Sequence, residues 1–250
     1  MLLDLTNVRK DFEGLRAVDD VSLSVPEGGI VGLIGPNGSG KSTLLNVIDG
    51  TLEPTAGQIV FAGRDITRLS ADQIFDLGLA RGFQDPALFF QMTALDNTLL
   101  PVKRQRGEHP WYAPWRRTWM RQEQANSGKA AAALKQVNLD THSGVMGSDL
   151  SGGQMKLLEI ARSLMGDPRM LLLDEPTAGV APRLAYSIFE QIAEMRRSLG
   201  ITFLIVEHRL EILFDFVDAV YVMHMGNILA QGTPDEISRN ARVREVYFGA

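Results

Sequence analysis

The first third of the chain alternates short apolar runs with glycine and proline, a pattern typical of β-strands. The runs LLDLTNVRKDF, AVDDVSLSV and IVGLIG are rich in branched residues, and GQIVFAGRDI predicts a hairpin that turns at Ala62 and Gly63. Residues 41–48 predict a helix after the third run. Ser70, followed three positions later by Gln73, has the pattern of a capping box, so a second helix is expected to begin there.

The last third of the chain has a different pattern, in which segments with helical periodicity alternate with fully apolar runs. A helix is expected from about Gly153, and the segments after it predict strands at 170–174, 201–206 and 219–223 and helices at 183–199 and near 209. Fully apolar strands that alternate with helices indicate a parallel sheet buried beneath helices. We therefore expect an α/β fold with a mainly parallel sheet and an antiparallel β part at the N-terminus.

The middle of the chain is polar and helical, and it contains the proline-broken piece EHPWYAPWRR. A chain of 250 residues with 45% apolar content can bury one sizeable core. We expect a single domain over residues 1–250, with a catalytic α/β core in 1–92 and 165–250. A smaller helical unit, in about 93–164, is inserted into this core.

The charge is distributed unevenly along the chain. The net charge is −5, yet residues 103–121 carry six basic residues against the single acid Glu108, a local charge of +5. The same stretch holds every tryptophan of the protein, spaced by four: Trp111, Trp115 and Trp119. The basic residues are Lys103, Arg104, Arg106, Arg116, Arg117 and Arg121. Three interpretations remain open: aromatic packing of the helical unit with solvated arginines, a surface for membrane subunits or anionic headgroups, and nucleic-acid binding.

The absence of cysteine excludes disulfides, zinc–thiolate sites and thiol catalysis. No apolar run reaches the roughly 18 residues that a membrane span needs. The N-terminal sequence has acids where a secretory signal needs an uninterrupted apolar core. We therefore expect the chain to stay in the cytosol.

The segment GPNGSGKST follows an apolar strand and precedes a helix, which is the setting of a phosphate-binding loop. In such a loop, glycine lets backbone N–H groups converge on phosphate oxygens. Lys41 would reach the terminal phosphates of ATP, and the Ser42 hydroxyl would ligate Mg²⁺. The predicted loop comprises Gly35, Pro36, Asn37, Gly38, Ser39, Gly40, Lys41, Ser42 and Thr43.

Two carboxylates end the apolar strand MLLLDEP. Asp174 fits the acid that P-loop ATPases place beside Mg²⁺, and Glu175 fits a base that orients or deprotonates the attacking water. Solvated acids at a strand end are the alternative for this pattern taken by itself. The phosphate-binding loop in the same chain favours the catalytic interpretation.

With LSGGQ at 150–154, these segments stand in an order and spacing that resembles the ATP-binding-cassette (ABC) ATPases over essentially the whole chain. The resemblance implies a P-loop ATPase core with an antiparallel β subdomain and an inserted α-helical subdomain. It also implies that Gln84 joins the core to the helical subdomain and reaches Mg²⁺ and water. His208 would contact the γ-phosphate, and Phe12 would stack on adenine with Val18 beside it.

The LSGGQ segment is a second glycine-rich helix start, far along the chain from the phosphate loop. A helix N-terminus carries unpaired N–H donors and partial positive charge, so it attracts anions. The resemblance implies that this segment caps the γ-phosphate bound by a second subunit, so that two chains, head to tail, enclose two ATP molecules. Near Ala181 the family usually carries an aspartate that contacts the opposite subunit; here the backbone or Thr177 would have to serve. The four segment residues concerned are Ser151, Gly152, Gly153 and Gln154.

Finer features, KLLEIARSL, TAGVAP and the tail ARVREVYFGA, resemble the ATPase subunits of importers for branched-chain or other hydrophobic amino acids. The implied partners are a second ABC ATPase, identical or similar, integral membrane permeases and, indirectly, an extracytoplasmic binding protein. The implied location is peripheral, on the cytoplasmic side of the cell membrane, with no nucleic acid bound. Lipopolysaccharide export, urea or amide uptake and a non-transport ATPase acting on nucleic acid remain as alternatives.

Overall fold

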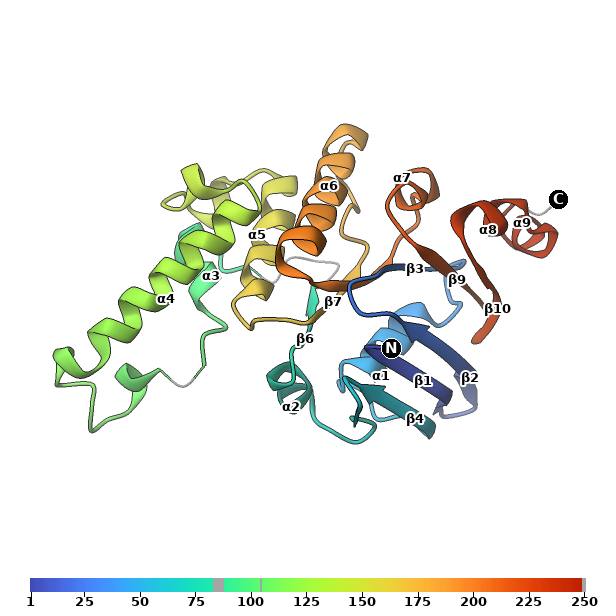
Figure 1. Cartoon of the computed structure of the whole chain (residues 1–250), viewed down its shortest axis with the longest axis horizontal. Helices are drawn as coiled ribbons and strands as arrows, with labels where there is room; N and C mark the ends of the chain where they lie inside the picture. The colour runs from blue at the N-terminus through green and yellow to red at the C-terminus, as the bar shows by residue number, and fades with distance from the viewer. Residues whose placement is uncertain (83–87, 104, 249–250) are drawn as a thin grey trace.

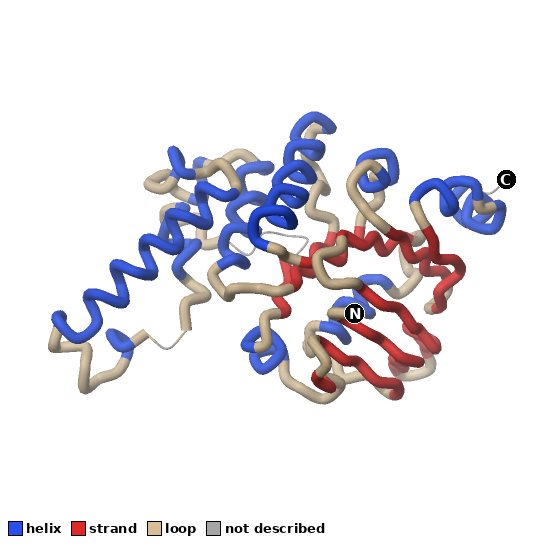
Figure 2. The backbone as a smooth tube through the Cα atoms, viewed as in Figure 1, coloured by secondary structure: helices blue, strands red, loops and turns tan. Residues whose placement is uncertain are grey.

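The computed structural model describes residues 1–82, 88–103 and 105–248. Two β-sheets lie together at one side of the molecule, and a group of helices extends from them at the other (Figure 1). Colouring by secondary structure separates the two parts, because the strands gather on the right of the view and the long helix of the middle segment lies on the left (Figure 2).

The larger sheet has six strands in the order β10-β9-β3-β8-β7-β6. Strands β9, β3, β8, β7 and β6 run parallel, and β10 pairs antiparallel with β9 at one edge. The bounds are Ile30–Ile34 for β3, Leu79–Gly82 for β6, Met170–Asp174 for β7, Thr202–Val206 for β8, Ala219–His224 for β9 and Asn227–Gly232 for β10.

The smaller sheet is antiparallel and has the order β2-β1-β4-β5. Its bounds are Leu3–Phe12 for β1, Leu15–Val25 for β2, Ala56–Phe61 for β4 and Arg64–Asp65 for β5. The hairpin between β4 and β5 turns at Ala62 and Gly63, as predicted, and both residues have positive φ angles.

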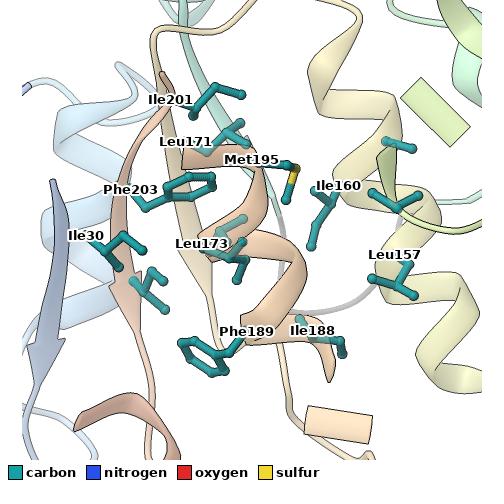
Figure 3. Packing of buried hydrophobic residues seen from close by; sticks show 14 of the residues in the cluster. Ile30, Leu157, Ile160, Leu171, Leu173, Ile188, Phe189, Met195, Ile201 and Phe203 are labelled. Atoms are coloured by element: carbon teal, nitrogen blue, oxygen red, sulfur yellow. The ribbon is translucent and has the colours of Figure 1, made fainter. Parts of the chain in front are cut away.

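Both faces of the parallel sheet are buried. Every residue of β3, β7 and β8 is buried, and successive residues of a strand point to opposite faces. On one side, Leu171, Leu173 and Phe203 pack with apolar residues of α5 (Gly152–Leu164) and α6 (Pro182–Leu199), as Figure 3 shows. On the other side, Leu172 and Leu204 pack with α1 (Lys41–Ile48) and the antiparallel sheet. The parallel sheet is therefore covered by helices on one face and by α1 with the second sheet on the other.

The remaining helices lie at the margins. Their bounds are Ala71–Asp76 for α2, Ala94–Leu99 for α3, Arg116–Gln136 for α4, Leu210–Phe214 for α7, Pro234–Arg239 for α8 and Ala241–Phe248 for α9. Short 3-10 turns occur at η1 (Arg106–Glu108), η2 (Asp140–His142) and η3 (Gly147–Asp149). Among the described residues, no helix is both long enough and apolar enough to cross a membrane.

The structure confirms the predicted fold class and most of the predicted elements. The capping box of Ser70 and Gln73 is formed at the start of α2. The sequence prediction missed β6, β10, α8 and α9. Strand β6 is short and contains a charged residue, Arg81, so it lacks the apolar run of its neighbours.

Candidate functional site

The loop of residues 35–43 connects β3 to α1 and adopts a backbone that favours glycine. Gly38 and Gly40 have φ angles of 77° and 102°, in a region that side chains disfavour. Gly40 is the N-cap residue of α1, and a Cβ atom there would lie 2.3 Å from the Ala17 carbonyl oxygen. The loop can thus lie close against β2 and present backbone N–H groups at the start of a helix, an arrangement that suits phosphate oxygens.

Lys41 begins α1, and its side chain turns back over the loop. Its Nζ atom donates hydrogen bonds to the carbonyl oxygens of Gly35 at 2.8 Å and Pro36 at 3.0 Å. An ammonium group has three donors, so one remains for a ligand. Burial lowers the pKa of Lys41, and the carboxylates of Glu175 and Asp174 oppose this shift.

A pocket of about 500 Å³ lies over this loop. It opens at the carboxyl ends of β3, β7 and β8, which are neighbours in the parallel sheet, and this edge is where α/β sheets generally bind ligands. The lining residues are Leu15, Arg16, Ala17, Glu175, His208, Met225, Gly226 and residues 37–43. The pocket therefore brings together the predicted phosphate loop and two of the three predicted catalytic residues.

Glu175 and His208 lie in contact with each other in the lining of this pocket. The Oε1 atom of Glu175 lies 3.0 Å from Nε2 of His208, and both side chains are only partly exposed. Glu175 has a φ angle of 50°, and non-glycine residues in this strained region cluster at functional sites. The pair follows two adjacent strands, β7 and β8, which explains why residues 33 positions apart meet.

Asp174 is held in a buried network of charges behind the pocket. Its Oδ2 atom accepts a hydrogen bond from Arg81 Nη2 at 2.9 Å, and Arg81 Nη1 lies 2.8 Å from Asp49 Oδ2. Arg81 also donates to the side chain of Asn46 on α1. The second carboxylate oxygen of Asp174, Oδ1, is buried and has no hydrogen-bond partner among the described residues. That oxygen is available to a cation.

Glu207 is a site residue that the sequence reasoning passed over. It is buried, and its Oε1 atom accepts hydrogen bonds from the backbone and side chain of Thr177. Its Oε2 atom accepts the backbone N–H of His208 at 2.7 Å. Glu207 therefore ties the segment after Glu175 to the segment that carries His208. The available signal was an acid directly after the apolar strand TFLIV, the same pattern that singled out Asp174.

Comparison with known proteins decides the family. A family model described as ABC transporter matches residues 18–178, which is more than half of the chain. The chain belongs to the ABC transporter family. A second model, described as branched-chain amino acid ATP-binding cassette transporter, matches residues 227–250.

Relatives of this ABC protein align along its whole length. A protein of Methanocaldococcus jannaschii named "Probable branched-chain amino acid transport ATP-binding protein LivG" is 41% identical over 252 residues, which cover 99% of this chain and 97% of the relative. A solved ATP-binding cassette of an ABC transporter in its ADP conformation is 40% identical, with a TM-score of 0.87, 100% of this chain covered and 99% of that one. A dimeric cassette in a post-hydrolysis state, bound to ADP and phosphate, is 25% identical, with a TM-score of 0.77 and coverage of 93% and 98%.

The LSGGQ segment of the cassette lies on a different element from the phosphate loop and does not line its pocket. Ser151 is the N-cap of α5, and its hydroxyl oxygen and backbone N–H form a capping box with Gln154. A Cβ atom at Gly153 would lie 2.0 Å from a Leu184 side-chain carbon, so glycine lets α5 approach α6 closely there. Ser151 and Gly152 are exposed, and their end of α5 is accessible to a second molecule.

Two other predicted site residues, Phe12 and Val18, are not among those that line the pocket. Phe12 lies at the end of β1 and is 42% exposed, with Lys10 Nζ 5.3 Å from its ring centre. The Val18 side chain is fully buried in the core and offers no exposed surface to an adenine ring; the neighbouring Leu15 and Ala17 line the pocket. Gln84 lies outside the described residues.

Proposed function

We propose that this chain is the ATP-binding and hydrolysing subunit of an importer for branched-chain or other hydrophobic amino acids. The observation that carries the substrate class is the match of residues 227–250 to the branched-chain cassette model. Whole-length similarity to a protein named for branched-chain amino acid transport supports it. Family membership accounts for ATP hydrolysis coupled to transport.

The pocket over residues 35–43 is the nucleotide site. Backbone N–H groups of the loop bind the β- and γ-phosphates, and the remaining donor of Lys41 neutralises part of their charge. Phe12 would contact the adenine; this assignment is supported by its pairing across β1 and β2 with the exposed Leu15, which lines the pocket. The loop residues from Gly35 to Thr43 make up the rest of the site.

Mg²⁺ fits the oxygen atoms at this site. Asp174 presents a buried carboxylate oxygen without a partner among the described residues, and carboxylate and hydroxyl oxygens are ligands that this ion prefers. Ser42, Asp174 and Gln84 would hold it. Bound there, Mg²⁺ supplies neutralisation of the charge on the β- and γ-phosphates. Arg81 holds the other oxygen of Asp174 and so orients the carboxylate.

Hydrolysis depends on Glu175 as the base that orients or deprotonates the attacking water. His208 lies 3.0 Å from this carboxylate and contacts the γ-phosphate. Glu207 is a positioning residue, because it holds the backbone of both segments without facing the pocket. General-base assistance is worth about 10²- to 10⁴-fold in rate, and we expect Glu175 to contribute in this range.

The working unit is a dimer of cassettes, which the dimeric relative supports. Ser151, Gly152, Gly153 and Gln154 of one subunit cap the γ-phosphate bound by the other. The Ser151 hydroxyl accepts a hydrogen bond from the Gln154 N–H, so its own proton is free to be donated to a phosphate oxygen. Loss of the γ-phosphate removes the anion that holds the two subunits together, and the dimer opens.

This cassette would act peripherally, on the cytoplasmic side of the cell membrane, with permease subunits and, through them, an extracytoplasmic binding protein. Residues 1–92 and 165–250 form its catalytic part. The helical part, residues 93–164, carries the LSGGQ end of α5 to the partner subunit.

Replacing the chromosomal copy by Glu175→Gln tests the proposal. The purified variant should bind ATP and hydrolyse it at least about 100-fold more slowly than wild type. Cells that carry it should lose uptake of labelled leucine, isoleucine and valine but keep uptake of glutamate. Unchanged uptake of the branched-chain amino acids, with hydrolysis abolished, would overturn the substrate class and leave the ATPase assignment intact.

A further inference from the structure

Residues 106–121, called the tip of the helical part below, expose two indole rings to solvent. The side chains of Trp111 and Trp115 are 79% and 70% exposed, and Tyr112 between them is 48% exposed. Trp119 differs, because its ring packs beside Gly107 and its Nε1 atom donates to the Ala113 carbonyl at 3.1 Å. Aromatic packing within the helical part therefore accounts for Trp119 alone, and the two exposed indoles need another explanation.

Exposed arginines lie close to these rings in the sequence. Four exposed arginines lie within residues 106–121, and they form no ion pair with any residue that the structure describes: Arg106, Arg116, Arg117 and Arg121. Lys103 is different, since its Nζ lies 3.0 Å from Asp76 on α2. The single acid of this stretch, Glu108, is exposed as well. The tip is strongly cationic, in a chain whose net charge is −5.

A groove runs beside the start of α4. Its lining includes the side chains of Arg106, Tyr112, Arg117 and Arg121. Guanidinium groups and a phenol converge there, and this combination binds phosphate oxygens. Trp111 and Trp115 are not among the lining residues, so the two indoles do not fill the groove.

This arrangement favours a lipid surface over the other polyanions. Sites for single-stranded nucleic acid stack successive bases on aromatic rings inside the basic groove, whereas here both indoles lie outside the lining and Tyr112 is its single aromatic ring. A site for a free phosphate ion would not explain the exposed indole rings, because the ion would not contact them. At a membrane interface, tryptophan and tyrosine lie at the level of the headgroups while arginine meets anionic phosphates. The tip also lies at the far end of α4 from α1 and the phosphate loop (Figure 1), so contact there leaves the nucleotide pocket accessible.

We propose that residues 106–121 are a membrane-contact site, in which Trp111 and Trp115 enter the headgroup region and the arginines of the groove bind the phosphates of anionic phospholipids. The contact requires neither ATP nor a permease, so the proposal can be tested independently of the transport role. Its charge also orients the molecule, because the remainder of the chain carries net negative charge and is repelled by the same surface.

The tryptophans themselves supply the assay, since all three lie in this tip. The full chain is mixed with vesicles of phosphatidylcholine alone or with about one-third phosphatidylglycerol, at about 0.05 M and about 0.5 M salt. We expect co-sedimentation and a blue shift of tryptophan emission with the anionic vesicles at low salt only. Brominated lipid should quench the emission of Trp119→Phe, which keeps the exposed rings, more than that of Trp111→Phe/Trp115→Phe.

Charge reversal provides the matched comparison. Arg116→Glu/Arg117→Glu should weaken binding at least about 30-fold, because each arginine near an anionic surface contributes roughly 5-fold. Arg64→Glu/Arg68→Glu changes the net charge equally on exposed residues of the antiparallel β part and should leave binding within about 3-fold of wild type. Unchanged ATP hydrolysis and circular dichroism in both double variants establish that they are folded.

Two results would overturn the proposal. The first is a wild-type chain that fails to bind anionic vesicles at low salt. If Arg116→Glu/Arg117→Glu then still abolishes co-purification with cell membranes or with single-stranded nucleic acid, the tip contacts a protein or a nucleic acid instead. The second result is equal loss of vesicle binding in the two charge-reversal variants, which would indicate nonspecific attraction.

Discussion

Arg81 offers the sharpest test of how the site is held together. Its guanidinium group lies between the carboxylates of Asp49 and Asp174, and the three side chains are only 9%, 10% and 6% exposed. Arg81→Met keeps most of the volume and leaves two buried carboxylates without their cation. Removing one partner of a buried pair costs about 3–5 kcal/mol. For a chain of this size that corresponds to a melting temperature lower by roughly 6–20 °C.

Arg169 provides the control, because its Nη2 atom lies 2.8 Å from Glu27 but the two side chains are 49% and 66% exposed. Arg169→Met should cost no more than about 1 kcal/mol, since water screens an exposed pair. Urea unfolding followed by circular dichroism gives both values. The double variant Arg81→Met/Asp49→Asn should recover part of the loss, because it removes one stranded charge. If Arg81→Met were no more destabilising than Arg169→Met, the network would not be a buried ionic one and the reasoning would fail.

Three further substitutions test the loop, the dimer and a helix start. Gly40→Ala should weaken binding of a fluorescent ATP analogue far more than Gly38→Ala. At Gly40 the new Cβ atom would lie 2.3 Å from a carbonyl oxygen. At Gly38 the new Cβ atom has open space, so that substitution costs only about 1–2 kcal/mol of backbone strain. Adding Ser151→Arg to Glu175→Gln should preserve ATP binding but abolish the ATP-dependent dimer in size-exclusion chromatography; a persisting dimer would contradict the capping role. Ala181→Asp should raise the free energy of unfolding by about 1 kcal/mol, because Ala181 is the N-cap of α6 without a side-chain hydrogen bond; no gain in urea unfolding would refute this.

The local elements that carry the candidate site could be predicted from the sequence. The glycine spacing and flanking apolar runs located the loop of residues 35–43, since both the strand before it and the helix after it have strong local patterns. The apolar strand ending in Asp174 and Glu175 was found for the same reason. The predicted role and the observed position disagree most for Val18, which was expected beside the adenine but lies in a strand whose side chains alternate between the core and solvent. A shift of one residue decides which face a side chain takes.

Contacts between distant segments could not be predicted from local patterns. Arg81 lies in a four-residue strand, and its partners Asp49 and Asp174 are 32 and 93 positions away. Nothing in the sequence near Arg81 signals that pairing. Glu207 likewise gains its role from Thr177, 30 positions earlier, across the adjacent ends of β7 and β8. Such pairs follow from strand order, which the periodicity of a single chain leaves open.

The tryptophan stretch shows why spacing alone misleads. Residues four apart share one face only where the backbone is helical, and on that assumption Trp111, Trp115 and Trp119 would form one packing surface. The helix α4, however, begins at Arg116, because Pro110 and Pro114 disfavour helical geometry at the residues before them and remove backbone donors. Only Trp119 lies within α4 and packs. Because the two prolines keep Trp111 and Trp115 out of the helix, these two rings stay exposed while Trp119 packs. The two exposed rings are the ones that can contact a membrane surface.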